Sequence, residues 1–264
     1  MKLSPRSIEL LTITLVSLII SCLSHLPAQT EQLNTNLNHS ASEQTKESSE
    51  DSKLDFSGDG RPGRRAGGGS RSLCPSTTMP LTALVPANNI GTTVSDRPNF
   101  WFYVPYAPQQ AAAGEFVLQD KQENDVYRQT FNLPNTPGLV SLKLPQAAPA
   151  LQVDRSYRWY FKLYCEDSAS ATANFVEGWI SRIPLKPNLE TQLKQGKNPA
   201  YKEYGIDSIW FDALDSLAQL RLDRDNSQLV REWNELLSAE GVNLNNLTQK
   251  PLVGEVTNTS QGNE

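Results

Sequence analysis

Apolar and polar side chains alternate with a period of two residues along much of the chain between positions 81 and 184. Proline, glycine and asparagine separate these stretches, a pattern typical of β-strands joined by turns. Seven strands are predicted, at Leu81–Val85, Phe100–Val104, Glu115–Gln119, Val126–Phe131, Leu139–Leu144, Tyr157–Cys165 and Asn174–Pro184. Because the strands are short and no helical period interrupts them, they predict an antiparallel β-sandwich.

The longest predicted strand indicates which of its faces is buried. One face carries Tyr157, Trp159, Phe161, Leu163 and Cys165, and the other carries Arg158, Tyr160, Lys162 and Tyr164. The stretch from Leu151 to Tyr157 resembles the tyrosine corner of immunoglobulin and fibronectin type III domains, where a tyrosine near the start of a strand bonds to upstream backbone. We therefore expect a sandwich of the immunoglobulin or fibronectin type III kind.

After Pro184 the hydrophobic period becomes helical. Leu189 and Leu193 predict a short helix, and two longer apolar stripes follow at residues 206–220 and 229–237. The run Asp225–Ser227 offers N-cap side chains for the second stripe, and Gly241 ends it. We expect a helical hairpin packed on the sandwich, with Trp210 and Trp233 buried, and hence a β-rich α+β fold.

Aromatic residues are concentrated in two of the predicted strands. Tyr103, Tyr160 and Tyr164 fall on the outward half of these strands, where they could form an exposed platform for a sugar or a peptide. The alternative is that the helical hairpin covers them, which we favour because its apolar stripes require an apolar surface to pack against.

The N-terminus has the three parts of a secretory signal peptide at residues 1–28. Lys2 and Arg6 precede an apolar run at Leu10–Ile20, and Ala28 suits cleavage by signal peptidase. In an alternative maturation, Cys22 is the lipidated residue of a loose lipobox and anchors the chain at the envelope. Either reading predicts export to the periplasm or beyond, with no spanning segment after cleavage.

Residues 29–72 predict a disordered linker. Its first part is rich in Asn, Ser, Thr, Gln and Glu and has too few large apolar side chains to form a core. Its end is basic and glycine-rich and contains Arg61, Arg64, Arg65 and Arg71. That end is either a flexible lead-in or a binding site for an anionic lipid, a polysaccharide or a partner protein. The sandwich should then cover residues 73–186, the helical part 187–253, and a disordered tail 254–264.

Three cysteines are present, and Cys22 lies within the signal. Two cysteines in an exported domain most simply form a disulfide, so we expect a Cys74–Cys165 bond. The alternative is two separate buried thiols.

Charge and histidine content exclude several functions. The formal net charge of −5 argues against nucleic-acid binding, which needs a basic surface. His25 and His39 are the only histidines, and both precede the predicted folded region. Histidine-dependent nucleophilic catalysis and histidine-ligated metals are therefore excluded there, and we expect no metal site, no cofactor and no catalytic residue.

Several separate blocks of the sequence resemble the family known as domain of unknown function 928. These blocks are Gly60–Arg71, Cys74–Pro75, Leu81–Pro86, Arg97–Pro105, Tyr157–Phe161, Val176–Trp179 and Ile209–Leu214. The resemblance spans residues 60–253 and implies an exported, mostly cyanobacterial protein. It implies no activity, substrate or catalytic residue.

The leading functional hypothesis is a non-catalytic envelope module that recognises a protein or a glycan. The recognition would use the sandwich surface or the basic Arg61–Arg71 segment. One alternative is a carboxylate-dependent hydrolase of envelope polysaccharide, which requires two acids facing each other across a cleft. Another is an accessory subunit of a secretion or sensory assembly.

Overall fold

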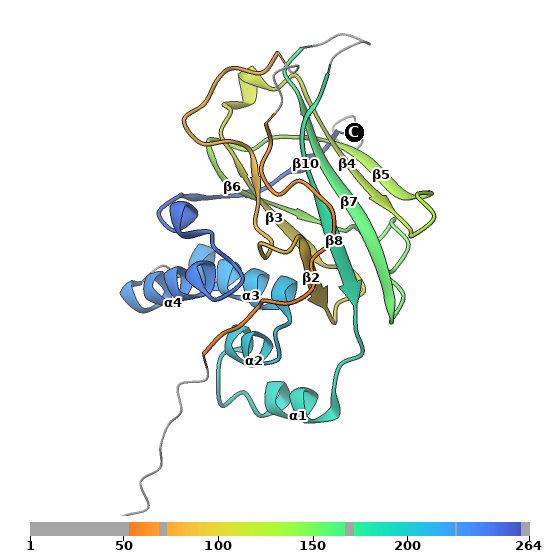
Figure 1. Ribbon diagram of the computed structural model, residues 1–264. Coiled ribbons are helices and arrows are strands. Elements are labelled where there is room, and N and C mark those ends of the chain that lie inside the picture. The colour runs from red at the N-terminus through yellow and green to blue at the C-terminus, as the bar shows by residue number, and fades with distance from the viewer. Residues whose placement is uncertain (1–52, 69–72, 167–171, 225, 260–264) are drawn as a thin grey trace, which may run out of the picture. The chain divides into compact units, whose positions relative to one another are not determined.

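A computed structural model describes residues 53–68, 73–166, 172–224 and 226–259. This described part of the chain forms two mixed β-sheets and four α-helices (Figure 1). One sheet has four strands in the order β1 (Thr82–Ala83), β3 (Asn99–Val104), β6 (Gly138–Lys143) and β9 (Leu252–Glu255). The other has six strands in the order β10 (Thr257–Asn258), β5 (Asp125–Asn132), β4 (Ala113–Gln119), β7 (Arg155–Tyr164), β8 (Asn174–Arg182) and β2 (Ile90–Thr93).

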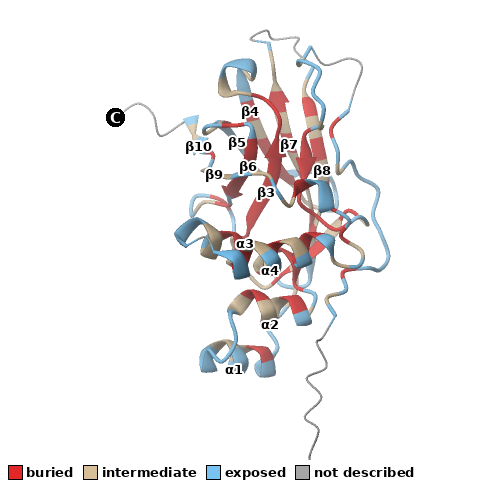
Figure 2. Ribbon diagram, turned by 90° about the vertical axis from the view of Figure 1, so that its left-hand side faces the viewer, coloured by how far each residue is buried: buried red, intermediate tan, exposed pale blue. Residues whose placement is uncertain are grey.

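The core between the two sheets is aromatic. Phe102 of β3 stacks on Phe161 of β7 with ring centroids 4.0 Å apart, and Phe100 lies 5.0 Å from Phe116 of β4. Along β7 the burial alternates as the sequence predicts, with Trp159 and Phe161 fully buried. Figure 2 shows the buried residues concentrated along β3, β4 and β7.

All seven predicted strands are present, but the antiparallel prediction is wrong in two places. β2 runs parallel to β8, and β9 runs parallel to β6. Three short strands, β2, β9 and β10, were missed because each is too short to show a period of its own and depends on a neighbouring strand for its hydrogen bonds. The Tyr157 hydroxyl accepts a hydrogen bond from the Gln152 N–H at 3.0 Å, as a tyrosine corner does, while likeness to immunoglobulin domains stays a prediction.

The helices gather at one end of the sheets (Figure 1). They are α1 (Pro187–Gln195), α2 (Ala200–Ile206), α3 (Trp210–Asp223) and α4 (Ser227–Ser238). α3 packs against β2 and β3 and also contacts α2 and α4. Trp210 and Trp233 are fully buried as predicted, and the Asn226 side chain accepts hydrogen bonds from the Gln228 and Leu229 N–H groups at the start of α4.

One position of the predicted helical stripe is wrong. Ile206 is the last residue of α2 and is 55% exposed, because the helical conformation is interrupted before α3 begins. Ser208, between the two helices, has a φ of 56°, a left-handed conformation that a right-handed helix does not contain. α3 and α4 contact each other, but the expected helical hairpin stays a prediction, since α2 contacts α3 as well.

Residues 53–68 fall within the predicted disordered linker, but they pack on the folded body. The Phe56 ring is buried against Trp210, with centroids 4.9 Å apart, and the Phe56 N–H donates to the Glu240 carbonyl at 2.9 Å. Further along, Arg64 exchanges two backbone hydrogen bonds with Glu177 of β8. In Figure 1 this segment, in orange, passes the helices and continues along β8.

The segment is ordered because it completes an open sheet edge. β2 pairs only with residues 179–182 of β8, so the backbone of Glu177 would otherwise lack a partner on that side. The glycines that suggested disorder serve close packing instead. A Cβ on Gly67 would lie 2.6 Å from the Asn174 Oδ1 atom, so a larger residue would force this side chain to move.

The predicted tail also begins later than expected, since β9 and β10 place residues up to Asn258 in the sheets. Cys74 and Cys165 form the predicted disulfide. The signal peptide, Cys22 and Arg71 lie outside the described residues. Within the described ranges, none of the helices has the length and apolar character needed to cross a membrane.

Candidate functional site

The outer face of the six-stranded sheet carries alternating side chains of β7 and β8 that are only partly buried. The Glu177 carboxylate of β8 forms an ion pair with the Arg158 guanidinium of β7, with 2.6 Å between oxygen and nitrogen. Aromatic rings lie on either side of this pair along the strands, with Trp179 at one end and Tyr160 and Phe175 at the other. The strand pattern thus places charged groups and rings side by side on one surface.

Two arginines from the N-terminal segment lie over these rings. The Arg61 guanidinium carbon is 4.9 Å from the centroid of Trp179, and that of Arg64 is 4.5 Å from Phe175. The Trp179 indole N–H donates to the Pro62 carbonyl at 3.0 Å, which holds the segment against the sheet. We call this surface the arginine–aromatic face and define it by Arg61, Arg64, Arg158, Tyr160, Phe175 and Trp179.

The arginines of this face differ in their charge balance. Arg158 is neutralised by Glu177 and lies 5.0 Å from the Tyr160 ring centroid. Arg61 and Arg64 are exposed, and no carboxylate within the described ranges forms an ion pair with either. Contact with the rings holds both guanidiniums at the surface, where they can donate hydrogen bonds to an anionic group from outside. One Arg64 N–H group also donates to the Gly68 carbonyl at 3.4 Å.

Ion pairs connect neighbouring strands of the sheet beside this face. Glu115 of β4 contacts Lys162 at 2.8 Å and Arg128 at 2.6 Å. Burial opposes ionisation of Glu115, but its hydrogen bonds to Lys162 and Arg128 outweigh that cost and lower the pKa of Glu115. The pKa of the Tyr160 hydroxyl is raised, mainly by burial, so it is neutral and remains a hydrogen-bond donor.

The predicted binding residues separate into different environments. Tyr103 is buried in the four-stranded sheet, with its ring centroid 5.4 Å from the Lys250 ammonium, so the three tyrosines do not share one platform. α3 covers that side of β3, where the Trp101 indole N–H donates to Asp215 at 3.1 Å. Tyr160 and Tyr164 lie on the other sheet and are partly exposed, so the helices cover only one of the two aromatic surfaces.

Arg65 lies apart from its neighbours Arg61 and Arg64. Its guanidinium turns inward and donates to the carbonyls of Val242 and Asn243, the latter at 2.8 Å. Burial lowers its pKa. Arg65 therefore anchors the segment to the loop after α4 and is not available to a ligand.

Phe175 and Trp179 were not among the predicted site residues. The signal was present in the period of two at residues 175–179, which places both rings on the same face as Glu177. The sequence could not show that Arg61 and Arg64, more than a hundred residues earlier, lie over them.

Sequence reasoning also missed a carboxylate pair, Asp212 and Asp215, one turn apart on α3. Both line a pocket of about 170 Å³ between α3 and the start of β3. One Asp215 oxygen accepts hydrogen bonds from the Asn99 side chain at 2.9 Å and from the Trp101 indole. Asp212 accepts from the Val94 N–H at 3.2 Å, and burial raises its pKa to about 6. Both groups bind α3 to the sheets.

Metal ligands are not clustered in the described ranges, where no group of three or more His, Cys, Asp or Glu side chains could hold an ion. The carboxylates near the site have partners of other kinds. Glu115 and Glu177 bind cations of the same sheet, and Asp120 accepts hydrogen bonds within its own turn.

The fold and the face define a β-rich α+β protein whose N-terminal segment places two arginines over aromatic rings of a sheet surface. The chain belongs to the family Domain of Unknown Function (DUF928), whose model matches residues 66–252. This match confirms the resemblance seen in the sequence blocks. A search of curated proteins found no match.

Proposed function

We propose that the protein is a non-catalytic binding module of the cell envelope that recognises acidic groups of a partner glycan or protein. The observation that carries the proposal is the pair of exposed guanidiniums, Arg61 over the ring of Trp179 and Arg64 over the ring of Phe175. Guanidiniums held at a surface in this way are suited to bidentate contact with carboxylate, sulfate or phosphate groups.

The low entropy of the two arginines supports this role. A free arginine loses about 2 kcal/mol of rotamer entropy when a ligand fixes it. Here the rings and the Trp179–Pro62 hydrogen bond already restrict the segment, so less ordering is needed on binding. Because the chain as a whole is negatively charged, it repels polyanions in general. An anionic partner would therefore bind at the local cationic surface rather than anywhere on the protein.

The disulfide and the predicted signal peptide support an envelope location. The hydrogen bonds of Asp212 and Asp215 favour a binding module over a carboxylate-dependent hydrolase, because both side chains already hold α3 in place. A role as an accessory subunit is compatible with the same face, since the partner would then be a protein with acidic side chains.

The test compares the protein with an Arg61→Ala/Arg64→Ala variant. Binding to polygalacturonate and dextran sulfate is measured by biolayer interferometry, and protein partners are identified by pull-down from the native envelope with mass spectrometry. We expect the variant to lose at least about tenfold in affinity, because each charge-assisted contact contributes about 1.5–3 kcal/mol. Binding of the unaltered protein should weaken as salt rises.

A Lys121→Ala/Lys197→Ala variant is the matched control, because it removes the same charge from two exposed positions outside the face. The Arg61→Lys/Arg64→Lys variant keeps the charge but loses the planar guanidinium with its paired donors, and it should recover only part of the affinity. Equal binding by the double-alanine variant and the control variant would refute the proposal.

A further inference from the structure

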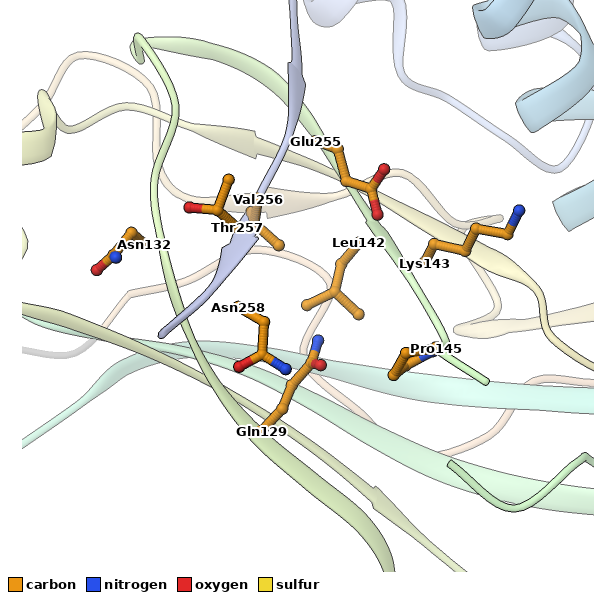
Figure 3. Close-up of a pocket in the computed structure, with 9 residues that line it drawn as sticks. All are labelled: Gln129, Asn132, Leu142, Lys143, Pro145, Glu255, Val256, Thr257 and Asn258. Atoms are coloured by element: carbon orange, nitrogen blue, oxygen red, sulfur yellow. The ribbon is translucent and has the colours of Figure 1, made fainter. Parts of the chain in front are cut away.

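A second surface hollow lies between the two sheets, far along the chain from the arginines. It has a volume of about 560 Å³, within the range of small-molecule sites. Side chains from β5, β6 and the C-terminal strands line it, namely Gln129, Asn132, Leu142, Lys143, Pro145, Glu255, Val256, Thr257 and Asn258. Figure 3 shows the carboxamides of Gln129 and Asn258 pointing toward one another beside Leu142.

The chain's path explains why this hollow exists. β9 pairs with β6 of the four-stranded sheet through Glu255, and two residues later β10 pairs with β5 of the six-stranded sheet. The segment therefore crosses from one sheet to the other at Val256, whose N–H donates to the Ser141 carbonyl at 2.9 Å. The crossing joins the two sheets at this edge, and residues 255–258 line one wall of the cleft.

The polar lining has a balanced composition. It contains one carboxylate, Glu255, one ammonium group, Lys143, three carboxamides and a hydroxyl. Neither Glu255 nor Lys143 is ion-paired to any residue in the described ranges. The Gln129 Oε1 atom accepts from the Tyr127 hydroxyl at 2.9 Å, so the NH2 group is the donor side of this carboxamide.

This chemistry favours an uncharged polyhydroxyl ligand. Carboxamides donate and accept at once, and a carboxylate accepts from two neighbouring hydroxyls, as the edge of a sugar ring requires. Pro145 is partly exposed and supplies apolar surface for the C–H groups of the ring, while Leu142 and Val256 are buried beneath the cleft. Glu255 and Lys143 have opposite signs, so the lining carries no net charge that would select a charged ligand.

We infer that the cleft between β5, β6 and β10 binds one or two uncharged pyranose units of an oligosaccharide. Gln129 and Asn258 contact one side of the sugar, and Glu255 accepts hydrogen bonds from its hydroxyls. Because no aromatic ring lines the cleft, we expect a dissociation constant on the order of 1 mM for a disaccharide. This site is separate from the arginine–aromatic face and does not depend on it.

The experiment titrates the purified protein with cellobiose, maltose and diacetylchitobiose, and with digalacturonate as a charged comparator. Saturation-transfer difference NMR detects binding, and chemical shifts of the ¹⁵N-labelled protein locate it. Saturable binding of an uncharged disaccharide should shift the amides of β5 and β10. Gln129→Ala and Glu255→Gln should each weaken it by about tenfold, the size expected when a hydrogen bond in the site is lost.

Gln109→Ala and Glu166→Gln make the same chemical changes at exposed positions outside the cleft and should leave binding unchanged. Thermal unfolding confirms that each variant is folded, and Glu255→Gln keeps the side-chain volume. The inference is overturned if no uncharged probe binds up to roughly fifty times the expected constant, or if binding survives both cleft variants unchanged. Digalacturonate binding that only the Arg61→Ala/Arg64→Ala variant abolishes would instead support the arginine–aromatic face alone.

Discussion

Asp212 connects α3 to the residues that follow β2, and its pKa makes the stability of the fold depend on pH. It lies in the first turn of α3, and its carboxylate accepts hydrogen bonds from the Thr93 side chain and the Val94 N–H. Burial raises its pKa from 3.8 to about 6, and the nearby Asp215 acts in the same direction. The folded protein therefore holds a proton on Asp212 more tightly than the unfolded chain does.

This pKa predicts the sign of a pH effect on stability. The contribution of Asp212 is fully present below pH 3.8 and is lost as pH rises toward about 6, a fall of up to ~3 kcal/mol in the free energy of unfolding. Asp212→Asn should lack this fall, so its stability relative to the unaltered protein should increase from pH 4 to pH 6. Urea unfolding at a series of pH values measures the difference.

Asp120→Asn supplies a control of opposite sign. Hydrogen bonds from Asn124 lower the pKa of Asp120, so its contribution is lost as pH falls. If Asp212→Asn and the unaltered protein keep a constant difference across this pH range, the assignment of Asp212 as a buried acid is wrong.

At the scale of elements, the N-terminal segment depends on close backbone approach. Gly241, just after α4, has a φ of 77°, and a Cβ there would lie 2.3 Å from the backbone nitrogen of Ser57. The same contact region contains the Phe56 N–H donating to the Glu240 carbonyl. A single glycine thus allows the segment to dock where any side chain would displace it.

Gly241→Ala should release residues 53–58 from the body. If the segment stays docked, the free energy of unfolding should fall by several kcal/mol. If it detaches locally, hydrogen exchange at Phe56 and Ser57 should increase. Gly196→Ala is a matched control, since Gly196 also has a positive φ of 60° but has open space around its Cβ position. That variant should lower the free energy of unfolding by only about 1 kcal/mol, the usual cost of a left-handed backbone conformation for a residue other than glycine. Equal behaviour of the two variants would contradict the docking.

At the scale of the whole molecule, the disulfide closes a long stretch of chain. Cys74 precedes β1 of the four-stranded sheet, and Cys165 follows β7 of the six-stranded sheet, 91 residues later. The bond therefore connects the entry to one sheet with the end of the central strand of the other. Its loss should affect the stability of the whole sandwich.

A Cys74→Ser/Cys165→Ser variant should lose about 2–5 kcal/mol of unfolding free energy, because the unfolded chain is freed from a large loop. Guanidinium unfolding followed by tryptophan fluorescence measures this, since four tryptophans lie fully buried in the described core. Reductant should destabilise the unaltered protein by a similar amount and leave the variant unchanged. A variant as stable as the parent would show that the bond does not constrain the fold.

The sequence alone determined the elements whose side chains repeat over several residues. The two faces of β7, the helical stripes, the buried Trp210 and Trp233 and the Cys74–Cys165 bond could all be predicted, because local period and pairing chemistry leave few alternatives. The prediction failed for segments without a period, such as β2 and β10, whose hydrogen-bond partners lie far away in the sequence.

Tertiary structure decided which side chains meet. Arg61, Arg64 and Arg65 read alike in the sequence, yet two of them lie exposed over rings of β8 and the third is an inward anchor. The glycine-rich segment that carries them has the composition of a disordered linker, but an open sheet edge gives its backbone partners that composition cannot show. Long-range hydrogen bonds and close packing depend on residues brought together by folding, so only the folded chain places the arginines on the aromatic face and the amides in the cleft.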